Sequence, residues 1–199
     1  MTEHEDIQKS KIYTRKGDNG QTTLFNMEHV SKSNPCFECL GDIDEANAYI
    51  GIIDDIKISV SNKKISIIDI QNQLIDIQSR LLDCGSHIAT PLTSSSSTKI
   101  SLTAFDHYHV EQLELWIDTL DSCLPPLKNF ILPQSPFHIV RTIIRRAERH
   151  LIPLIDSGDC DQTVLKYLNR LSDYFFVLAR YTSKSETIYS KTRPNPIHK

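Results

Sequence analysis

Four of the chain's nine arginines fall within nine residues, at Arg141, Arg145, Arg146 and Arg149. Guanidinium groups are permanent cations with several N–H donors, so a cluster of them can hold an anionic ligand. The chain as a whole carries a formal net charge of -3, which makes this cluster a local feature. The pattern favours a small anion over general affinity for nucleic acid. The alternative is a solvated arginine face with Glu148 as a partner.

A second candidate for anion binding lies near the N-terminus, between Thr14 and Thr23. Gly17 and Gly20 permit positive φ and close backbone approach, while Lys16 and the threonine hydroxyls can donate to phosphate oxygens. The spacing matches neither G-x-x-x-x-G-K-[ST] nor G-x-G-x-x-G, and no βαβ pattern surrounds it. Alone, the same stretch is also typical of an ordinary turn. Together with the arginines it indicates a site for a polyphosphate.

Other site chemistries find less support in the sequence. Cys36 and Cys39 form one C-x-x-C pair, but zinc needs two further ligands, and the only close histidines are His107 and His109. We expect structural thiols, because five scattered cysteines favour reduced thiols over a disulfide framework. No glutamate precedes a histidine at the Glu-x-x-His spacing of di-metal bundles, and no G-x-S-x-G motif is present.

Periodic apolar residues predict helices that position these groups. Seven apolar positions step by three or four residues from Ile67 to Ile88, which is typical of a bundle seam. Similar stripes predict four more helices, over Leu40–Ile53, Val110–Leu120, Phe137–Leu151 and Val164–Ala179. Asp161 is a predicted cap for the last of them, and Asp42 and Glu45 are expected on the face of the first that is opposite its apolar stripe.

The chain has 199 residues, of which 39% are apolar, and this is enough for one substantial core. Five amphipathic helices offset their ordering entropy only by packing together, which predicts a single all-α domain over residues 12–184. We expect a flexible N-terminus over residues 1–11, a short extended segment over residues 12–25, and a polar tail over residues 185–199. The serine-rich stretch 92–103 is predicted to be a mobile, solvated loop.

Targeting signals and membrane spans are not apparent in the sequence. The chain has no apolar run of about eighteen residues, so no membrane-spanning helix is predicted. Residues 1–11 fit neither a secretory signal nor an arginine-rich transit peptide. As written, the chain is expected to be cytoplasmic, and the mitochondrial matrix would require a longer natural N-terminus.

Several motifs occur along the chain in a fixed order: Thr14–Thr23, Gly41–Glu45, Phe130–Pro133, Arg141–Arg149 and Asn169–Asp173. Together they resemble the motifs of the PduO-type ATP:cob(I)alamin adenosyltransferases, and the likeness runs from residue 12 to residue 181. The segment Ile77–Gly85 is similar to the second-helix pattern of that family. The resemblance implies a homotrimer of five-helix bundles, with ATP held between the N-terminal segment of one subunit and helices of its neighbour.

The resemblance also implies a reaction and a set of residues. Co(I) of cob(I)alamin would attack the ribose 5′ carbon of ATP and release triphosphate, with Mg²⁺ expected on the phosphates. Catalytic positions would be Arg145, Phe130, and Arg141 paired with Asp44 across the subunit boundary. The residues that the resemblance places around ATP are Thr14, Arg15, Lys16, Gly17, Asp18, Gly20, Thr22, Thr23, Lys32, Arg145, Glu148 and Asn169.

Phe130 matches the family's aromatic residue that occupies the side of cobalt vacated by its lower axial ligand. From the residues alone, the alternative is a core phenylalanine that opens a helix. One departure from the family pattern follows it, because only Gln134–Phe137 separates Pro133 from His138, and the usual Gly-Gly turn is missing. The corrinoid end of the site is therefore expected to be reshaped.

Two functions from different classes follow. One is an active corrinoid adenosyltransferase, for which the resemblance implies a cobalamin reductase and an adenosylcobalamin-dependent client enzyme as partners. The other is an ATP-binding trimeric bundle that senses nucleotide or delivers cofactor without efficient turnover. A purely structural bundle is a third alternative, and it predicts no thermal shift with MgATP. Nucleic acid and membranes are not expected partners.

Overall fold

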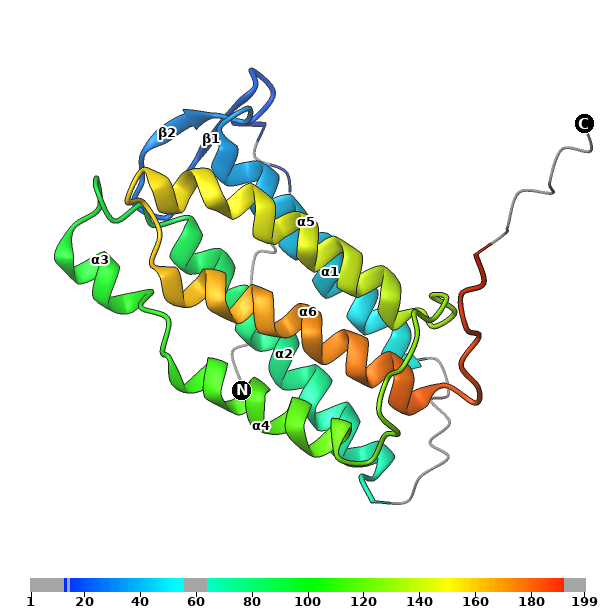
Figure 1. The fold of residues 1–199 in the computed structure, drawn as a ribbon. Helices are drawn as coiled ribbons and strands as arrows, with labels where there is room; N and C mark the ends of the chain where they lie inside the picture. The colour runs from blue at the N-terminus through cyan, green and yellow to red at the C-terminus, as the bar shows by residue number, and fades with distance from the viewer. Residues whose placement is uncertain (1–12, 14, 56–63, 192–199) are drawn as a thin grey trace, which may run out of the picture.

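The structure is a computed structural model that describes residues 13, 15–55 and 64–191. In this part of the chain, six helices form a bundle and two short strands form a hairpin at one end (Figure 1). The elements are β1 (Gln21–Thr23), β2 (His29–Ser31), α1 (Pro35–Asp55), α2 (Ile67–Ile88), α3 (Ser97–Leu102), α4 (Tyr108–Asp121), α5 (Phe137–Asp156) and α6 (Gln162–Thr182). This arrangement confirms the prediction of an all-α bundle with a short extended N-terminal segment.

The long helices pack in the order α2, α1, α5, α6 and α4, and the sequence-distant helices α1 and α5 lie side by side (Figure 1). The apolar stripes predicted from the sequence form the core between them. On α2, Ile70, Leu74, Ile77, Leu81, Cys84 and Ile88 are all buried, whereas Ile67, the first predicted seam residue, is exposed. On α5, the stripe from Phe137 to Leu151 is buried as predicted. Helix periodicity therefore identified the core.

Local capping explains where two of the helices begin. Ser66 precedes α2, and its hydroxyl accepts from the backbone N–H of Asp69 while the Asp69 carboxylate accepts from the Ser66 N–H. This reciprocal pair is a capping box, which satisfies two N–H groups that a helix start leaves free. Asp161 caps α6 by accepting from the N–H of Thr163 at 2.7 Å, which confirms the predicted cap.

The serine-rich stretch 92–103 differs from the predicted loop. It contains the short helix α3, whose cap is Ser96, because the Ser96 hydroxyl accepts from the N–H of Lys99. The stretch is also tied to the bundle by backbone and side-chain contacts, including Leu92 N to Asp159 O at 2.9 Å and the amide of Asn26 to Ser94. Serine serves here as a helix cap and a hydrogen-bond partner, so composition alone was misleading.

The cysteines form no disulfide within the described residues. All five are free thiols in the described residues, and four of them are buried: Cys36, Cys39, Cys84 and Cys160. Burial raises the pKa of Cys36 to about 11 and that of Cys160 to about 12. Within the described ranges, no group of three or more His, Cys, Asp and Glu side chains is arranged to hold a metal ion. No helix there is long and apolar enough to cross a membrane.

Candidate functional site

The N-terminal anion-binding candidate is a tight turn followed by the β1–β2 hairpin. Asp18 N donates to Arg15 O, and Gly20 N donates to Gly17 O, so the chain reverses twice within six residues. Gly20 has a φ of +78°, which favours glycine, while Arg15 reaches the same region at +60°. In the hairpin, Thr22 pairs with Val30 in antiparallel register. The predicted turn and extended segment are therefore both present, although Thr14 lies outside the described residues.

A cavity of 720 Å³ lies against this hairpin, within the range of small-molecule sites. Its lining consists of Lys16, Gly17, Asn19, Gln21, Thr22, Thr23 and His29. Lys32 is tied to the turn because its N–H donates to Gly20 O at 2.9 Å. A Cβ at Gly17 would lie 3.1 Å from Lys32 Nζ, so a glycine lets this ammonium group cross the turn closely. Ammonium, hydroxyl and amide donors thus converge where the sequence predicted phosphate.

The four arginines of α5 do not share one environment. Arg146 faces α1, where its Nε donates to Asp42 Oδ1 at 2.7 Å and its Nη2 donates to Glu45. Hydrogen bonding to Asp42 raises the pKa of Arg146. The second oxygen of Asp42 lies 2.8 Å from His150 Nδ1. The expectation that Asp42 lies opposite the packed face is therefore wrong, because it is buried at the α1–α5 contact.

Arg141 and Arg145 form no ion pair with any residue that the structure describes. Arg145 is exposed, and Arg141 is half-buried with a buried Nε that no described residue contacts by a hydrogen bond. Desolvation, followed by repulsion from Arg145, lowers the pKa of Arg141. Arg149 donates from Nη1 to the backbone oxygen of Arg145 at 2.8 Å, which orders the side chain along the helix. Two cations one helical turn apart are suited to an anion with several oxygens.

Glu148 and Asn169, both predicted to line the site, meet between α5 and α6. Asn169 donates to Glu148 Oε1 at 2.9 Å and accepts from Arg170 at 2.7 Å. Arg170 in turn contacts Glu114 on α4 at 2.7 Å. Asp173 lies one turn further along α6, where desolvation raises its pKa against the attraction of Arg170 and Arg145. Arg170 and Asp173 belong to the motif found in the sequence but were not predicted as site residues.

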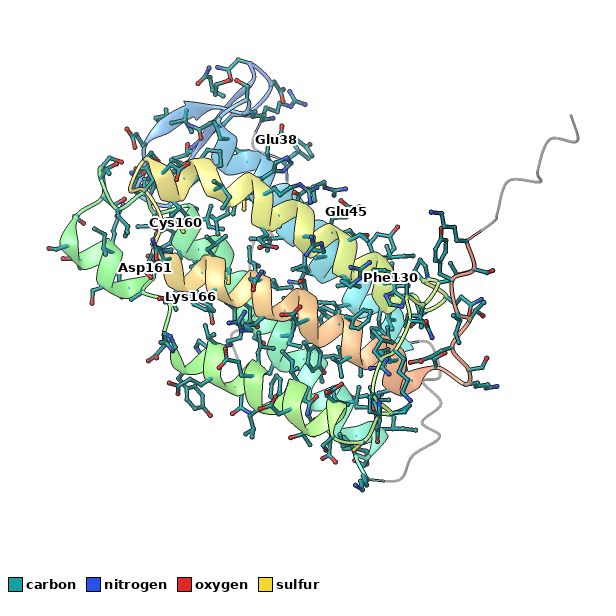
Figure 2. All side chains as sticks on the ribbon, in the orientation of Figure 1. Glu38, Glu45, Phe130, Cys160, Asp161 and Lys166 are labelled. Carbon is teal, nitrogen blue, oxygen red and sulfur yellow. The ribbon has the colours of Figure 1, made fainter. Side chains whose placement is uncertain are left out.

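Phe130 lies outside the core, on the segment that precedes α5. Its side chain is 82% exposed, so the interpretation as a buried phenylalanine is wrong (Figure 2). The nearby His138, on the first turn of α5, is buried, and its ring lies 6.0 Å from that of Phe176. Desolvation lowers the pKa of His138, with a further contribution from Arg141. A projecting aromatic ring next to an apolar, closely packed helix start is compatible with binding a flat ligand.

The hairpin and Phe130 lie at opposite ends of α5 (Figure 1 and Figure 2). The segment with Phe130 leads into the first turn of α5, whereas the hairpin contacts Ala89 through Phe25, near the chain that follows α5. Twenty helical residues span about 30 Å. The chain therefore keeps its two candidate binding regions far apart, and Arg145 lies between them on α5.

Asp44 and Arg141 are not brought together within the subunit. Among the described residues no ion pair joins them, and Asp44 instead lines a groove of 310 Å³ between α1 and α2. The other lining residues of the groove are Phe25, Leu40, Ile43, Asn47, Leu81, Leu82, Gly85, Ser86 and Ala89. The lining of the groove is mostly apolar, and Asp44 contributes a carboxylate to it. The pairing of Asp44 with Arg141 across a subunit boundary stays a prediction.

Comparison with known proteins agrees with this geometry. Residues 12–182 match the model of the family described as cobalamin adenosyltransferase. The chain is 41% identical over 190 residues to the corrinoid adenosyltransferase MMAB of Mus musculus, covering 91% of this chain and 78% of that protein. It is 39% identical over 175 residues to the corrinoid adenosyltransferase of Bacillus subtilis, covering 85% of each.

A solved structure shares the fold as well. It is a variant of a PduO-type ATP:corrinoid adenosyltransferase from Lactobacillus reuteri, complexed with cobalamin and ATP. It superimposes with a TM-score of 0.78 at 33% sequence identity, covering 91% of this chain and all of that one. The matched residues span the hairpin, all six helices and every described candidate site residue. This chain belongs to the cobalamin adenosyltransferase family.

Proposed function

We propose that this chain transfers the 5′-deoxyadenosyl group of ATP to the cobalt of cob(I)alamin. A cobalt–carbon bond forms at the ribose 5′ carbon as the bond from that carbon to oxygen breaks, and its electron pair leaves with triphosphate. The cobalt is formally oxidised from +1 to +3 in the same step. The observation that carries the proposal is the pair of arginines on α5, Arg141 and Arg145, which form no ion pair within the described part of a chain whose hairpin offers donors for phosphate.

The protein's task in this reaction is alignment and charge stabilisation, since the nucleophile belongs to the corrinoid. Lys16, Lys32 and the N–H and hydroxyl groups of the hairpin would hold the triphosphate. Arg145 would stabilise the negative charge that builds on the departing group. Phe130, exposed on its segment, would occupy the lower side of the cobalt. No general base is required, which agrees with the absence of a nucleophile–histidine pair in the sequence.

We further propose that the active form is a homotrimer with each site shared by two neighbouring subunits. The distance between the hairpin and Phe130 supports this, because a neighbour can bring its hairpin to the middle of α5. Arg141 is half-buried, its buried Nε has no hydrogen-bond partner among the described residues, and Asp44 lies beside an apolar groove. Both residues therefore have the surroundings of an interface pair, in which a carboxylate of one subunit meets a guanidinium of the next.

Mg²⁺ and the protein partners complete the proposal. Mg²⁺ prefers phosphate oxygens and water to cages of protein ligands, so we propose that it enters as MgATP. A cobalamin reductase would supply Co(I), and an adenosylcobalamin-dependent enzyme would take the product. We propose the cytoplasm as the location and assign no role to nucleic acid or membranes.

The test is an anaerobic assay with MgATP and chemically reduced cobalamin, in which the absorbance change reports the cobalt–carbon bond. Wild-type protein should form adenosylcobalamin, and Arg145→Ala should lower kcat by about 10²–10³, as expected when one donor to a leaving anion is removed. Lys166→Ala removes an exposed cation from α6 and is the matched control. Binding of ATP without any product in the wild-type protein would replace this proposal with a nucleotide sensor.

A further inference from the structure

The described C-terminal residues are paired with the segment that carries Phe130. We call residues Ser185–Tyr189 the strap. Ile188 forms an antiparallel bridge with Ile131, Tyr189 N donates to Phe130 O at 2.8 Å, and Leu132 N donates to Thr187 O at 2.8 Å. The strap therefore fixes the backbone on both sides of Ile131, while the Phe130 ring points away from the core and stays exposed (Figure 2). This pairing differs from the free polar tail that the sequence predicted for residues 185–199.

A buried arginine anchors the strap to the bundle. Arg180, near the end of α6, has only 3% of its side chain exposed, and its Nε donates to Glu186 at 2.7 Å. Its Nη2 donates to the backbone oxygen of Pro125 at 2.9 Å, and its Nη1 lies 3.7 Å from Asp121. One guanidinium thus holds the strap and the start of the segment that leads to Phe130. Burying a guanidinium group is unfavourable unless hydrogen-bond acceptors and opposite charges compensate it, and Glu186, Pro125 and Asp121 do so for Arg180.

The geometry points to a positioning role for the strap, and this inference rests on the proposed function. We propose that the strap holds the backbone of Phe130 so that its exposed ring meets the corrinoid in one orientation. A ring on an unpaired connecting segment would lose conformational entropy on binding, whereas a ring on a paired segment has lost most of it beforehand. The hairpin lies towards the other end of α5, and Arg145 and Glu148 lie near the middle of this helix, so the strap should act mainly on the corrinoid.

Tyr189 offers a sharp test, because its backbone N–H makes the bond to Phe130. Tyr189→Pro removes this donor together with the side chain, and Tyr189→Ala removes the side chain but keeps the donor. We expect Tyr189→Pro to raise the KM for cob(I)alamin about fivefold over Tyr189→Ala, the size of one net hydrogen bond. The KM for ATP and the thermal shift caused by MgATP should be the same in both variants.

A spectroscopic measurement separates positioning from a general structural effect. With cob(II)alamin and MgATP bound, the absorption spectrum reports the fraction of corrinoid whose lower ligand has been removed. This fraction should fall in Tyr189→Pro and stay at the wild-type level in Tyr189→Ala. Glu186→Gln is a second variant, which weakens the anchor at Arg180 while keeping every strap N–H, and it should show a smaller change of the same kind.

The possible results are distinct. Equal corrinoid KM values and spectra in the Tyr189 variants would overturn the inference about the strap, with the wild-type activity intact. A matching loss of ATP binding in Tyr189→Pro would also overturn it, because the strap would then support the whole fold. If the wild-type protein binds ATP but forms no adenosylcobalamin, the proposed function fails, and the positioning role fails with it.

Discussion

Arg146 on α5 donates from Nε to Asp42 Oδ1 on α1 at 2.7 Å, and Asp42 is buried where the two helices meet. The same carboxylate contacts His150 through its other oxygen at 2.8 Å. One acidic group thus serves two side chains of α5. It pairs with Arg146, whereas Arg141, Arg145 and Arg149 form no ion pair with a described carboxylate.

Replacing Asp42 should destabilise the α1–α5 contact. In Asp42→Asn the uncharged amide offers a single acceptor oxygen, so Arg146 and His150 lose the carboxylate that they share. We expect the melting temperature to fall by a few degrees in thermal unfolding, with the thermal shift caused by MgATP unchanged. Glu45→Gln alters an exposed partner of the same arginine and should have a smaller effect. Equal melting temperatures for wild type and Asp42→Asn would contradict this role.

Much of the fold could be predicted from the sequence, because five helices have long apolar stripes with helical spacing. The helix α3 was missed since its six residues are too short for a periodic pattern, and none of them is buried. Its signal was the capping serine, Ser96, which is hard to separate from the other serines around it. The strap was missed for another reason. Pairing between residues 130–132 and 187–189 depends on distant parts of the chain, which local patterns do not report.

The site could be predicted in part. Charge density identified α5, but neighbouring residues on a helix point about 100° apart, so Arg145 and Arg146 face different partners. The rotation of α5 about its axis decides which of the two arginines pairs with a carboxylate of α1. That rotation is set by the packing of the two helices. Phe130 stands beside Ile131 and Leu132 and therefore resembles a core residue in sequence. The structure instead leaves its ring exposed, on a segment whose backbone pairs with the strap.

Protonation of His138 should lower stability in acid. Burial lowers the pKa of His138 below its ordinary value of 6.5, so the folded protein binds this proton less readily than the unfolded chain does. This contribution to stability is complete above pH 6.5 and is lost as the pH falls through the lowered pKa. His138→Gln should flatten that part of a plot of melting temperature against pH. His107→Gln, which replaces an exposed histidine, is the control for the same substitution at the surface.

Asp173 is expected to lower the stability of the folded protein at neutral pH while supporting its activity. Desolvation raises the pKa of Asp173, so the folded state resists its ionisation, and this cost grows as the pH rises above 3.8. Asp173→Asn should therefore raise the melting temperature at pH 7, with a gain that shrinks towards pH 4. The variant should also lose about tenfold in kcat/KM for ATP, since it removes a carboxylate whose negative charge interacts with Arg145.

The matched control for Asp173 is Asp118→Asn, which changes an exposed carboxylate on α4. It should leave both the melting temperature and the kinetics close to wild type. A lower melting temperature in Asp173→Asn at pH 7 would show that attraction to Arg170 and Arg145 outweighs desolvation. That result would assign Asp173 to the structural network of Arg170 and Glu114 and not to the site.

A shared site predicts that two inactive variants restore each other. Lys16→Ala damages the hairpin, and Arg145→Ala damages α5, so each variant alone should be inactive. If each site combines the hairpin of one subunit with α5 of the next, every mixed trimer contains one hairpin–α5 pair that is intact. Co-expressed and purified mixed trimers should then recover about one third of wild-type activity, as the cyclic arrangement dictates.

The restoration has a strict control, because both Lys16 and Lys32 belong to the hairpin side. Mixed trimers of Lys16→Ala and Lys32→Ala contain no hairpin that is intact, and they should stay as inactive as either parent. Restoration in this control would mean that the two lysines act independently in different sites. No restoration in the Lys16→Ala and Arg145→Ala mixture would place both groups in one subunit. The hairpin and Phe130 of one subunit would then have to move towards each other along α5. The close packing of the bundle opposes a movement of that size.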